Sequence, residues 1–289
     1  MTKRSGISLD ASALIAIRNQ IVAQHVISDD VTRLPGGFPI RKHGQGQEHA
    51  GSRPYVTGDD MRYIDKGTTA RTGALHVRSF HEERDRVSFL VADFRPAMLW
   101  GLRHRLRSVA AAEALVWLGW QAVISGGRVG VMAITAEEPF IVRTRGGTRG
   151  MLAVIGGLVR AHDAAIRSCQ TRGLTDPPLA KLLGGLERIA PKGAAVIIAS
   201  AFDKPGDPFR DALLALSTRR NLSLLVVEDG NDLGAGHYPM RVPGERRRLV
   251  TLAGPATVAP AIPRVPGCRI LRINSGLPVQ SAIARAEVA

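Results

Sequence analysis

The sequence predicts an α/β fold: a doubly wound, mostly parallel sheet with helices on both faces, preceded by an irregular N-terminal segment. Continuous apolar runs at residues 87–92, 194–200 and 222–227 are typical of strands covered on both faces. Segments with helical periodicity alternate with these runs between residues 87 and 229. Such alternation favours parallel pairing, because each helix returns the chain to the same end of the sheet.

The first 86 residues divide into three parts. Apolar residues recur at helical spacing from Leu9 to Ile21, which predicts an amphipathic helix over residues 9–27. Residues 32–60 contain repeated glycines, and we expect irregular chain there. Residues 61–86 are dense in charge.

Inside the predicted α/β domain, residues 103–124 form the strongest helix. This segment is apolar on nearly all sides, so we expect it to be well buried. The other predicted elements are strands at 128–134 and 140–144, and helices at 148–167, 178–189 and 208–219.

The tail from residue 230 is broken by Gly and Pro, with a strand pair predicted near 240–252 and a strand near 268–273. We expect it to be a β-rich extension packed on the same domain. The predicted organisation is an N-terminal helix and charged segment over 1–86, an α/β domain over 87–229 and the extension over 230–289.

The charge balance first suggests a polyanionic partner, because 39 Lys and Arg face 25 Asp and Glu, a net charge of +14. The surplus is spread, however: residues 1–86, 87–190 and 191–289 carry +3, +6 and +5. Basic runs at 103–107 and 246–248 read as solvated faces. Aromatic residues make up 4% of the chain, too few to favour base stacking. These counts disfavour nucleic acid as the partner.

The two cysteines, Cys169 and Cys268, lie far apart, which excludes a disulfide framework and a cysteine zinc site. Two free thiols are typical of a reducing compartment. The N-terminal apolar run is too short for a signal peptide, and no run of about 18 apolar residues could span a membrane. We therefore expect a cytoplasmic protein with no membrane span.

A series of short motifs between residues 44 and 86 carries a family resemblance. They are G-x-G-x-E, R-x-Y, G-D-D-x-R-x-I-D, T-A-R, L-x-V-R and E-E-R, in this order. Together they resemble the signature of the bacterial family called domain of unknown function 58. The signature residues that we take as a candidate interaction site are Gly44, Gly46, Glu48, Arg53, Tyr55, Gly58, Asp59, Asp60, Arg62, Asp65, Thr69, Arg71, Arg78, Glu82, Glu83 and Arg84.

The resemblance continues more weakly to residue 229 and implies a fold and a partner. The second part of this family resembles von Willebrand factor A domains. Its members are typically encoded beside MoxR-type AAA+ ATPases and are thought to assemble or activate other complexes with them. Many members also carry two N-terminal membrane helices, which this chain lacks, so it looks like the short, soluble form.

The resemblance also implies where a cation would bind. Von Willebrand domains hold a divalent cation with D-x-S-x-S after the first strand, but here Asp93 is followed by Arg95 and Ala97. Mg²⁺ prefers oxygen ligands, so we expect Arg95 to pair with Asp93 in the cation's place. We therefore expect no cofactor and no divalent cation. Thr148 is an alternative to Thr144 in the rim of this degenerate cation site, which comprises Asp93, Arg95, Ala97, Thr144, Ser200 and Asp203.

The charged cluster of the signature has two readings. Asp59, Asp60 and Asp65 are residue types that hold a divalent metal or phosphate in phosphoryl-transfer enzymes. Acids and arginines alternate along the segment, however, which favours a network of ion pairs that fixes its backbone. The stretch Gly44 to Glu48 follows no clear strand, so it reads as a tight turn and not as a nucleotide-binding loop. Two loop histidines, His43 and His49, are too few for a metal site.

These observations predict a non-enzymatic cytoplasmic adaptor that works with a MoxR-type AAA+ ATPase on a client protein, for example in maturation of a periplasmic dehydrogenase such as methanol dehydrogenase. One alternative is a metal-dependent protein-binding domain with Asp93 and Asp203 as ligands. Another is a nucleic-acid binder that uses the basic surface. A phosphoryl-transfer enzyme built on Asp59, Asp60 and Asp65 is the last.

Overall fold

The computed structural model describes residues 6–27, 43–57, 59–81, 86–101, 104–172, 175–229, 234–240, 248–252 and 262–288. The chain forms two compact units. Unit 1 consists of Met1–Pro35 and Val87–Ala289, and unit 2 consists of Gly36–Arg86. The N-terminal helix therefore belongs to unit 1, and the charged signature segment forms unit 2.

Unit 1 is built on a seven-stranded sheet with the strand order β11-β10-β7-β6-β3-β4-β5. The five strands from β10 to β4 are parallel to their neighbours, while β5 and β11 join antiparallel. The strands are β3 (Val87–Asp93), β4 (Arg128–Ile134), β5 (Phe140–Gly146), β6 (Ala195–Ser200), β7 (Asn221–Glu228), β10 (Arg269–Asn274) and β11 (Glu287–Val288). The mostly parallel sheet is the one that the apolar runs predict.

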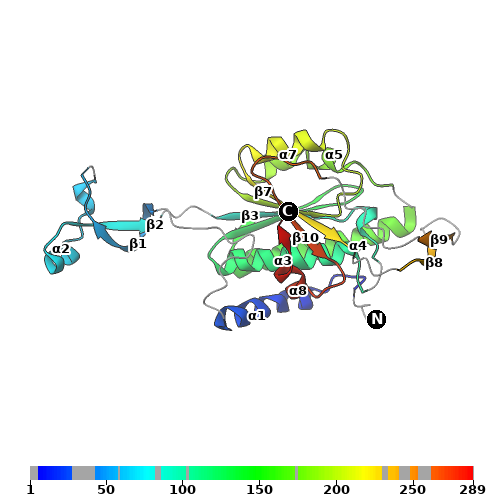
Figure 1. Cartoon of the computed structure of the whole chain (residues 1–289), viewed down its shortest axis with the longest axis horizontal. Coiled ribbons are helices and arrows are strands. Elements are labelled where there is room, and N and C mark those ends of the chain that lie inside the picture. The colour runs from blue at the N-terminus through cyan, green and yellow to red at the C-terminus, as the bar shows by residue number, and fades with distance from the viewer. Residues whose placement is uncertain are drawn as a thin grey trace. The chain divides into compact units, whose positions relative to one another are not determined.

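Helices cover both faces of this sheet (Figure 1). One apolar cluster joins α1 (Ala11–Ile27), α3 (Arg107–Ile124), α4 (Gly147–Arg172) and α8 (Val279–Ala284) to one face. A second cluster joins α5 (Leu179–Leu183), α6 (Leu186–Ile189) and α7 (Phe209–Ser217) to the other. The α/β class with helices on both faces is confirmed.

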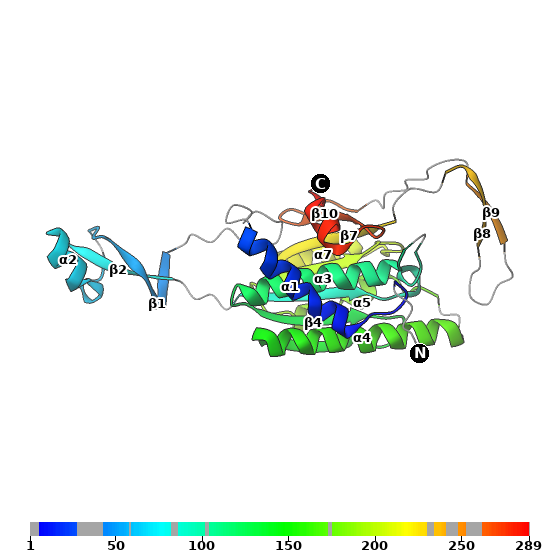
Figure 2. The same ribbon diagram turned by 90° about the horizontal axis from the view of Figure 1, so that it is seen from below.

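The predicted helix over residues 9–27 is confirmed as α1, which lies across α3 and α4 (Figure 2). Its buried side chains are those of Leu14, Ile17 and Ile21, while Ala13 is exposed. Asp10 caps the helix, because its carboxylate accepts a hydrogen bond from the backbone N–H of Ala13 at 3.0 Å.

Several boundaries differ from those predicted. Helix α3 begins at Arg107 and not at 103, and α4 continues to Arg172, five residues beyond its predicted end. The single helix predicted over 178–189 is two, α5 and α6, because the chain breaks at Gly184-Gly185.

Unit 2 corrects the prediction of irregular chain. Strand β1 (His43–Pro54) pairs antiparallel with β2 (His76–His81), with register shifts between Gly44 and Gly51. The stretch from Gly44 to Glu48 is therefore part of a bulged strand and not a tight turn. A 3-10 turn, η1 (Met61–Tyr63), and α2 (Lys66–Thr72) connect the two strands.

The C-terminal strands follow the prediction in part. Strands β8 (Gly236–Met240) and β9 (Arg248–Leu252) pair with each other in a separate two-stranded sheet. The strand predicted near 268–273 is β10, which extends the main sheet beside β7, and α8 follows it unpredicted. Among the described residues, we find no helix with the length and apolar character to cross a membrane.

Candidate functional site

The candidate site lies where the parallel strands end. We call this side of unit 1, formed by the residues that follow β3, β4, β6 and β7, the carboxyl end of the sheet. Ligands of such sheets bind beyond the carboxyl ends of the strands. Asp93 is the last residue of β3 and Ser200 the last of β6, and both side chains are fully buried. Their neighbour Arg95 is only 1% exposed.

Arg95 and Asp93 form a buried ion pair. The guanidinium Nε donates to both carboxylate oxygens, at 3.0 and 3.2 Å, and Nη2 donates at 2.8 Å. The backbone N–H of Arg95 and the Ser200 hydroxyl add bonds of 3.0 and 2.6 Å to the same carboxylate. Every lone-pair direction of Asp93 is thus directed at a donor of the protein.

The rest of the guanidinium binds backbone carbonyls from two loops. Nη1 donates to Pro177 at 2.7 Å and to Lys204 at 3.4 Å, and Nη2 donates to Asp203 at 3.1 Å. Burial alone lowers the pKa of Arg95, but the charge of Asp93 and its hydrogen bonds outweigh this, and the pKa is raised. Arg95 therefore carries the positive charge of this site, at the position where the resemblance places a cation.

The loop held by Arg95 has a strained backbone. Phe202 and Lys204 adopt positive φ angles of 57° and 48°, which L-residues rarely populate. The Ser200 hydroxyl accepts a hydrogen bond from the N–H of Phe202 at 2.9 Å, and the carbonyl of Lys204 accepts one from Leu179 at 3.3 Å. Such strain persists only where the surroundings impose it, and here the buried pair does so.

A second, more exposed ion-pair group borders the first. Arg107 bridges Asp203 at 2.9 Å and Asp229 at 2.6 Å, and its guanidinium lies 4.4 Å from the centroid of the Trp100 ring. The Ser275 hydroxyl donates to Asp229 at 2.7 Å. Partial burial raises the pKa of Asp203, against the opposing effect of Arg107. Residues at the ends of β3, β6 and β7 thus meet at this end of the sheet.

Two residues of the predicted rim have other surroundings. The N–H of Ala97 donates to Asp176 at 3.0 Å, within the short 3-10 turn η2 (Pro96–Met98). Thr144 lies at the opposite end of the sheet, beside Gly130 near the start of β4, because β5 runs antiparallel. Its assignment to the rim was wrong, and Thr148, at the start of α4, lies at the same far end. Thr135 follows β4 at the carboxyl end instead.

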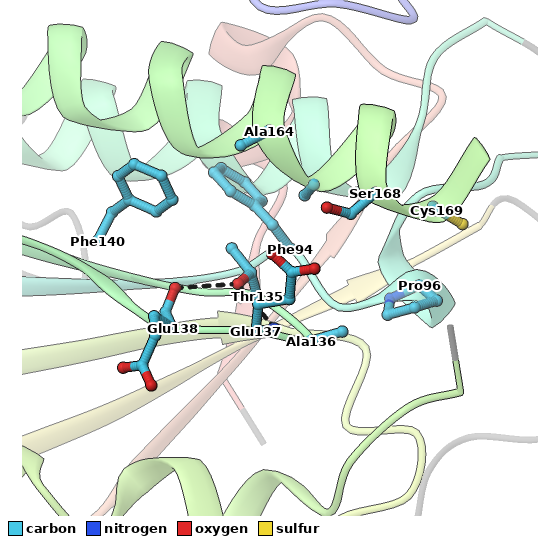
Figure 3. A pocket seen from close by; sticks show the side chains of 11 residues that line it. Phe94, Pro96, Thr135, Ala136, Glu137, Glu138, Phe140, Ala164, Ser168 and Cys169 are labelled. Atoms are coloured by element: carbon cyan, nitrogen blue, oxygen red, sulfur yellow. Dashed lines mark hydrogen bonds between the residues drawn. The ribbon is translucent and has the colours of Figure 1, made fainter. Parts of the chain in front are cut away.

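A hollow of about 200 Å³ opens beside Phe94 and Pro96, the chain neighbours of Arg95 (Figure 3). In the close-up, the Phe94 ring lies below α4, with Phe140 on one side and Cys169 on the other. Glu137 and Glu138 are exposed, in the turn that Thr135 holds with two hydrogen bonds of 3.1 Å. The hollow is lined by Phe94, Pro96, Thr135, Ala136, Glu137, Glu138, Phe140, Ala164, Ala165, Ser168 and Cys169.

In unit 2, the acidic signature residues are engaged locally. Asp59 binds Arg53 through two hydrogen bonds of 2.6 and 2.7 Å, and Asp60 binds Arg62 at 2.6 Å. The guanidinium of Arg62 lowers the pKa of Asp60 to about 2. Asp65 caps α2. Several hydrogen-bond donors lower the pKa of Asp65, and the Ser52 hydroxyl has the largest effect. This arrangement corresponds to the ion-pair network and leaves these carboxylates committed to protein donors.

The other signature residues mainly bind the backbone of unit 2 or lie within its strands. The N–H of Tyr55 donates to the carbonyl of Leu75 at 2.9 Å, and the Thr69 hydroxyl accepts from the N–H of His76 at 3.0 Å. Arg71 is exposed. Gly44, Gly46 and Glu48 lie in β1 and Arg78 lies in β2. The predictions for Gly58, Glu82, Glu83 and Arg84 fall outside the described residues.

Sequence reasoning missed a buried polar pair beneath the site. Nε2 of His162, on α4, lies 2.9 Å from the Ser108 hydroxyl on α3, and the ring meets Phe94 edge-on at 5.1 Å between centroids. Burial lowers the pKa of His162 to about 4, so the ring is neutral. Among the described residues no acid binds its other ring nitrogen, Nδ1, so the pair lacks a catalytic triad's third member. Over the described part of the chain, no group of three His, Cys, Asp or Glu side chains could hold a metal ion.

Comparison with known proteins adds a family. The sequence pattern of the family described as "Protein of unknown function DUF58" matches residues 51–238. The chain is 30% identical over 198 residues to the uncharacterized proteins Rv1480 of Mycobacterium tuberculosis and Mb1516 of Mycobacterium bovis. The match covers 66% of this chain and 57% of each relative, so the chain spans little more than half their length.

Proposed function

We propose that this chain, which belongs to the DUF58 family of proteins of unknown function, is a non-enzymatic adaptor that binds protein partners without a metal ion. The observation that supports this most is the buried pair of Arg95 and Asp93 at the carboxyl end of the sheet. It supplies positive charge where the von Willebrand factor A resemblance expects a divalent cation.

The pair makes the site unsuited to a cation for an electrostatic reason. A divalent ion bound to Asp93 would lie within a few ångströms of a guanidinium that has no contact with water. Arg95 would have to leave, abandoning its bonds to three loop carbonyls in the process. The rigid loop that a cation would otherwise order is therefore ordered by the protein itself.

The surface around the pair has features of a protein-binding site. The hollow beside Phe94 offers apolar walls of a size that accepts one side chain. Glu137 and Glu138 line it, and the exposed Trp100 follows β3 at the same end of the sheet. This combination favours a partner segment with an apolar residue next to a cation.

The identity of the partner rests on the family resemblance. We propose a MoxR-type AAA+ ATPase, with the pair acting in the cytoplasm on a client such as a periplasmic dehydrogenase. The adaptor's von Willebrand factor A-like domain would then contribute the carboxyl end of its sheet to the ATPase.

A capture experiment tests the proposal. Tagged full-length chain, immobilised in native lysate, should retain an AAA+ ATPase equally well in EDTA and in Mg²⁺, and the variant A164R should lose it because the new side chain fills the hollow. The matched control is Q170R, on the exposed side of the same helix. Retention only in Mg²⁺, or equal loss in both variants, would refute the assignment of this surface.

Calorimetry supplies an independent check. Titration of the wild-type chain with Mg²⁺ should give no binding heat, because Arg95 fills the site. Saturable binding at submillimolar Mg²⁺ would establish the metal-dependent alternative instead.

A further inference from the structure

The fold of unit 1 separates charges that are mixed along the sequence. The acids Glu137, Glu138, Asp203 and Asp229 follow strands, and Glu228 is the last residue of β7, so all five lie at the carboxyl end of the sheet. Ion pairs gather there too, including those of Arg172 with Glu137, Arg107 with Asp203 and Asp229, and Arg272 with Glu228.

A row of cations lies at the opposite side, the amino end, where the parallel strands begin. Arg269 and Arg128 are the first residues of β10 and β4, and Arg219 and Lys192 lie in the turns before β7 and β6. Strand β5 runs the other way, so it ends there with Arg145, and Arg149 follows in the first turn of α4. We call these six residues the amino-end row.

Strand pairing places the row on two stretches of one sheet edge, β10-β7-β6 and β4-β5, which β3 separates. Arg269 pairs with Ser223 of β7, Asn221 of β7 with Ala195 of β6, and Arg128 with Gly146 of β5. The N–H of Gly193 binds the carbonyl of Arg219 at 2.8 Å, which ties the two middle turns together. With neighbouring strands about 4.8 Å apart, the five steps from β10 to β5 span about 24 Å.

Five cations of the row are exposed and have no acidic partner among the described residues. The sixth, Arg128, is half-buried. The surrounding segments 125–129, 143–149, 191–195, 218–221 and 266–270 contain no Asp or Glu, whereas the sequence before β3 contains Glu82, Glu83 and Asp85. The nearby helix α6 carries one exposed acid, Glu187.

Helix dipoles explain only part of this arrangement. Lys192 and Arg219 follow the C-termini of α6 and α7, where a cation is favourable. Arg145 and Arg149 flank the N-terminus of α4, where the helix dipole disfavours positive charge. Cations placed against the local dipole and without an acidic partner point to an external anion.

The shape and composition of the amino end favour a broad anionic surface. Gly126, Gly147, Gly193 and Gly267 have open space where a side chain would be, so the turns have a low profile. Ile124 is 40% exposed four residues before Arg128. The segments of the row contain no aromatic residue on which bases could stack.

We propose that the amino end of the sheet docks on an anionic phospholipid membrane. Five of the six cations are Arg, whose guanidinium matches phosphate oxygens in pairs. A low-profile row beside an exposed aliphatic side chain suits a flat headgroup layer that the aliphatic group can enter. The phosphate backbone of a nucleic-acid duplex has no apolar layer into which this aliphatic side chain could insert. Docking by this end leaves the carboxyl end, some six strand residues away, open to the protein partner.

Vesicle sedimentation of the full-length chain tests this proposal. Binding is expected to vesicles of phosphatidylglycerol and phosphatidylcholine in equal parts, and not to phosphatidylcholine alone, and should vanish in high salt. Each cation near an anionic surface contributes about fivefold in partition. The triple variant R145Q/R149Q/R219Q should therefore bind about 100-fold more weakly.

The matched control removes three exposed cations far from the row. The variant R160Q/R167Q/R210Q changes the net charge equally and should keep most of the binding. Equal loss in both triple variants would overturn the proposal, because it would reduce the effect to net charge. So would absence of vesicle binding together with binding to a random-sequence DNA duplex that the row variant abolishes.

Discussion

Replacing Arg95 with Met tests whether the buried pair holds the carboxyl end together. Met keeps the apolar stem but removes every side-chain donor. Asp93 would then retain only the backbone N–H of residue 95 and the Ser200 hydroxyl, with no exposed surface through which water could reach it. Breaking a buried ion pair by removing one partner costs about 3–5 kcal/mol. The loss of donors to three loop carbonyls places R95M toward the upper end of that range.

The double variant D93N/R95M separates charge from packing. Without a carboxylate, no buried charge is left uncompensated, so the double variant should be destabilised by only about 1–2 kcal/mol. The second substitution should thus restore about 2–3 kcal/mol of the stability that R95M loses.

Urea unfolding followed by tryptophan fluorescence measures these differences, because Trp100, Trp117 and Trp120 all lie in unit 1. A single variant destabilised by less than about 1 kcal/mol, or a double variant no more stable than the single one, would refute the reasoning.

Three further predictions concern unit 1. Because burial lowers the pKa of His162 to about 4, the unfolded chain binds its proton first, and stability should fall by up to about 3 kcal/mol as the pH drops from 6.5 to 4. The pH profile of H162F should lack this component, and equal profiles would contradict it. A Cβ at Gly150 would lie 2.3 Å from the Arg145 carbonyl oxygen, so G150A should lose about 1–3 kcal/mol in urea unfolding. At Gly185 nothing lies within 4 Å and φ is −92°, so G185A should gain about 0.5 kcal/mol and serves as the control. The variant K204G removes the strain of a positive φ, so the free energy of unfolding should rise by about 1 kcal/mol and the thermal midpoint should increase. A lower midpoint would contradict this prediction.

Local pattern predicted the parts of the fold that are buried on two faces. Strands β3, β6 and β7 appear as continuous apolar runs because helices cover both their sides. Once these strands are parallel, their ends must meet, so Asp93 and Ser200 could be placed together without knowing any contact.

The rest depended on information that is not local. Strand β1 consists largely of Gly, His, Gln and Ser, which have low strand propensity, and it forms through its pairing with β2 about 30 residues away. Thr144 was misplaced because a short apolar run gives no strand direction, and β5 runs antiparallel. The donors from Arg95 to the loop carbonyls follow from tertiary packing alone.

The charge pattern shows why a tally along the chain misleads in a parallel α/β fold. Such a fold places every turn from helix to strand at one end of the sheet and every turn from strand to helix at the other. A charge tally over consecutive thirds of the sequence mixes the two kinds of turn. A surplus of positive charge that is confined to one kind of turn then appears evenly spread. In this chain Arg128, Lys192 and Arg219 precede strands, whereas Asp203 and Asp229 follow them. If the charges of unit 1 are counted by kind of turn, a basic amino end stands opposite an ion-paired carboxyl end. The proposed adaptor, with one partner at each end, would account for both surfaces.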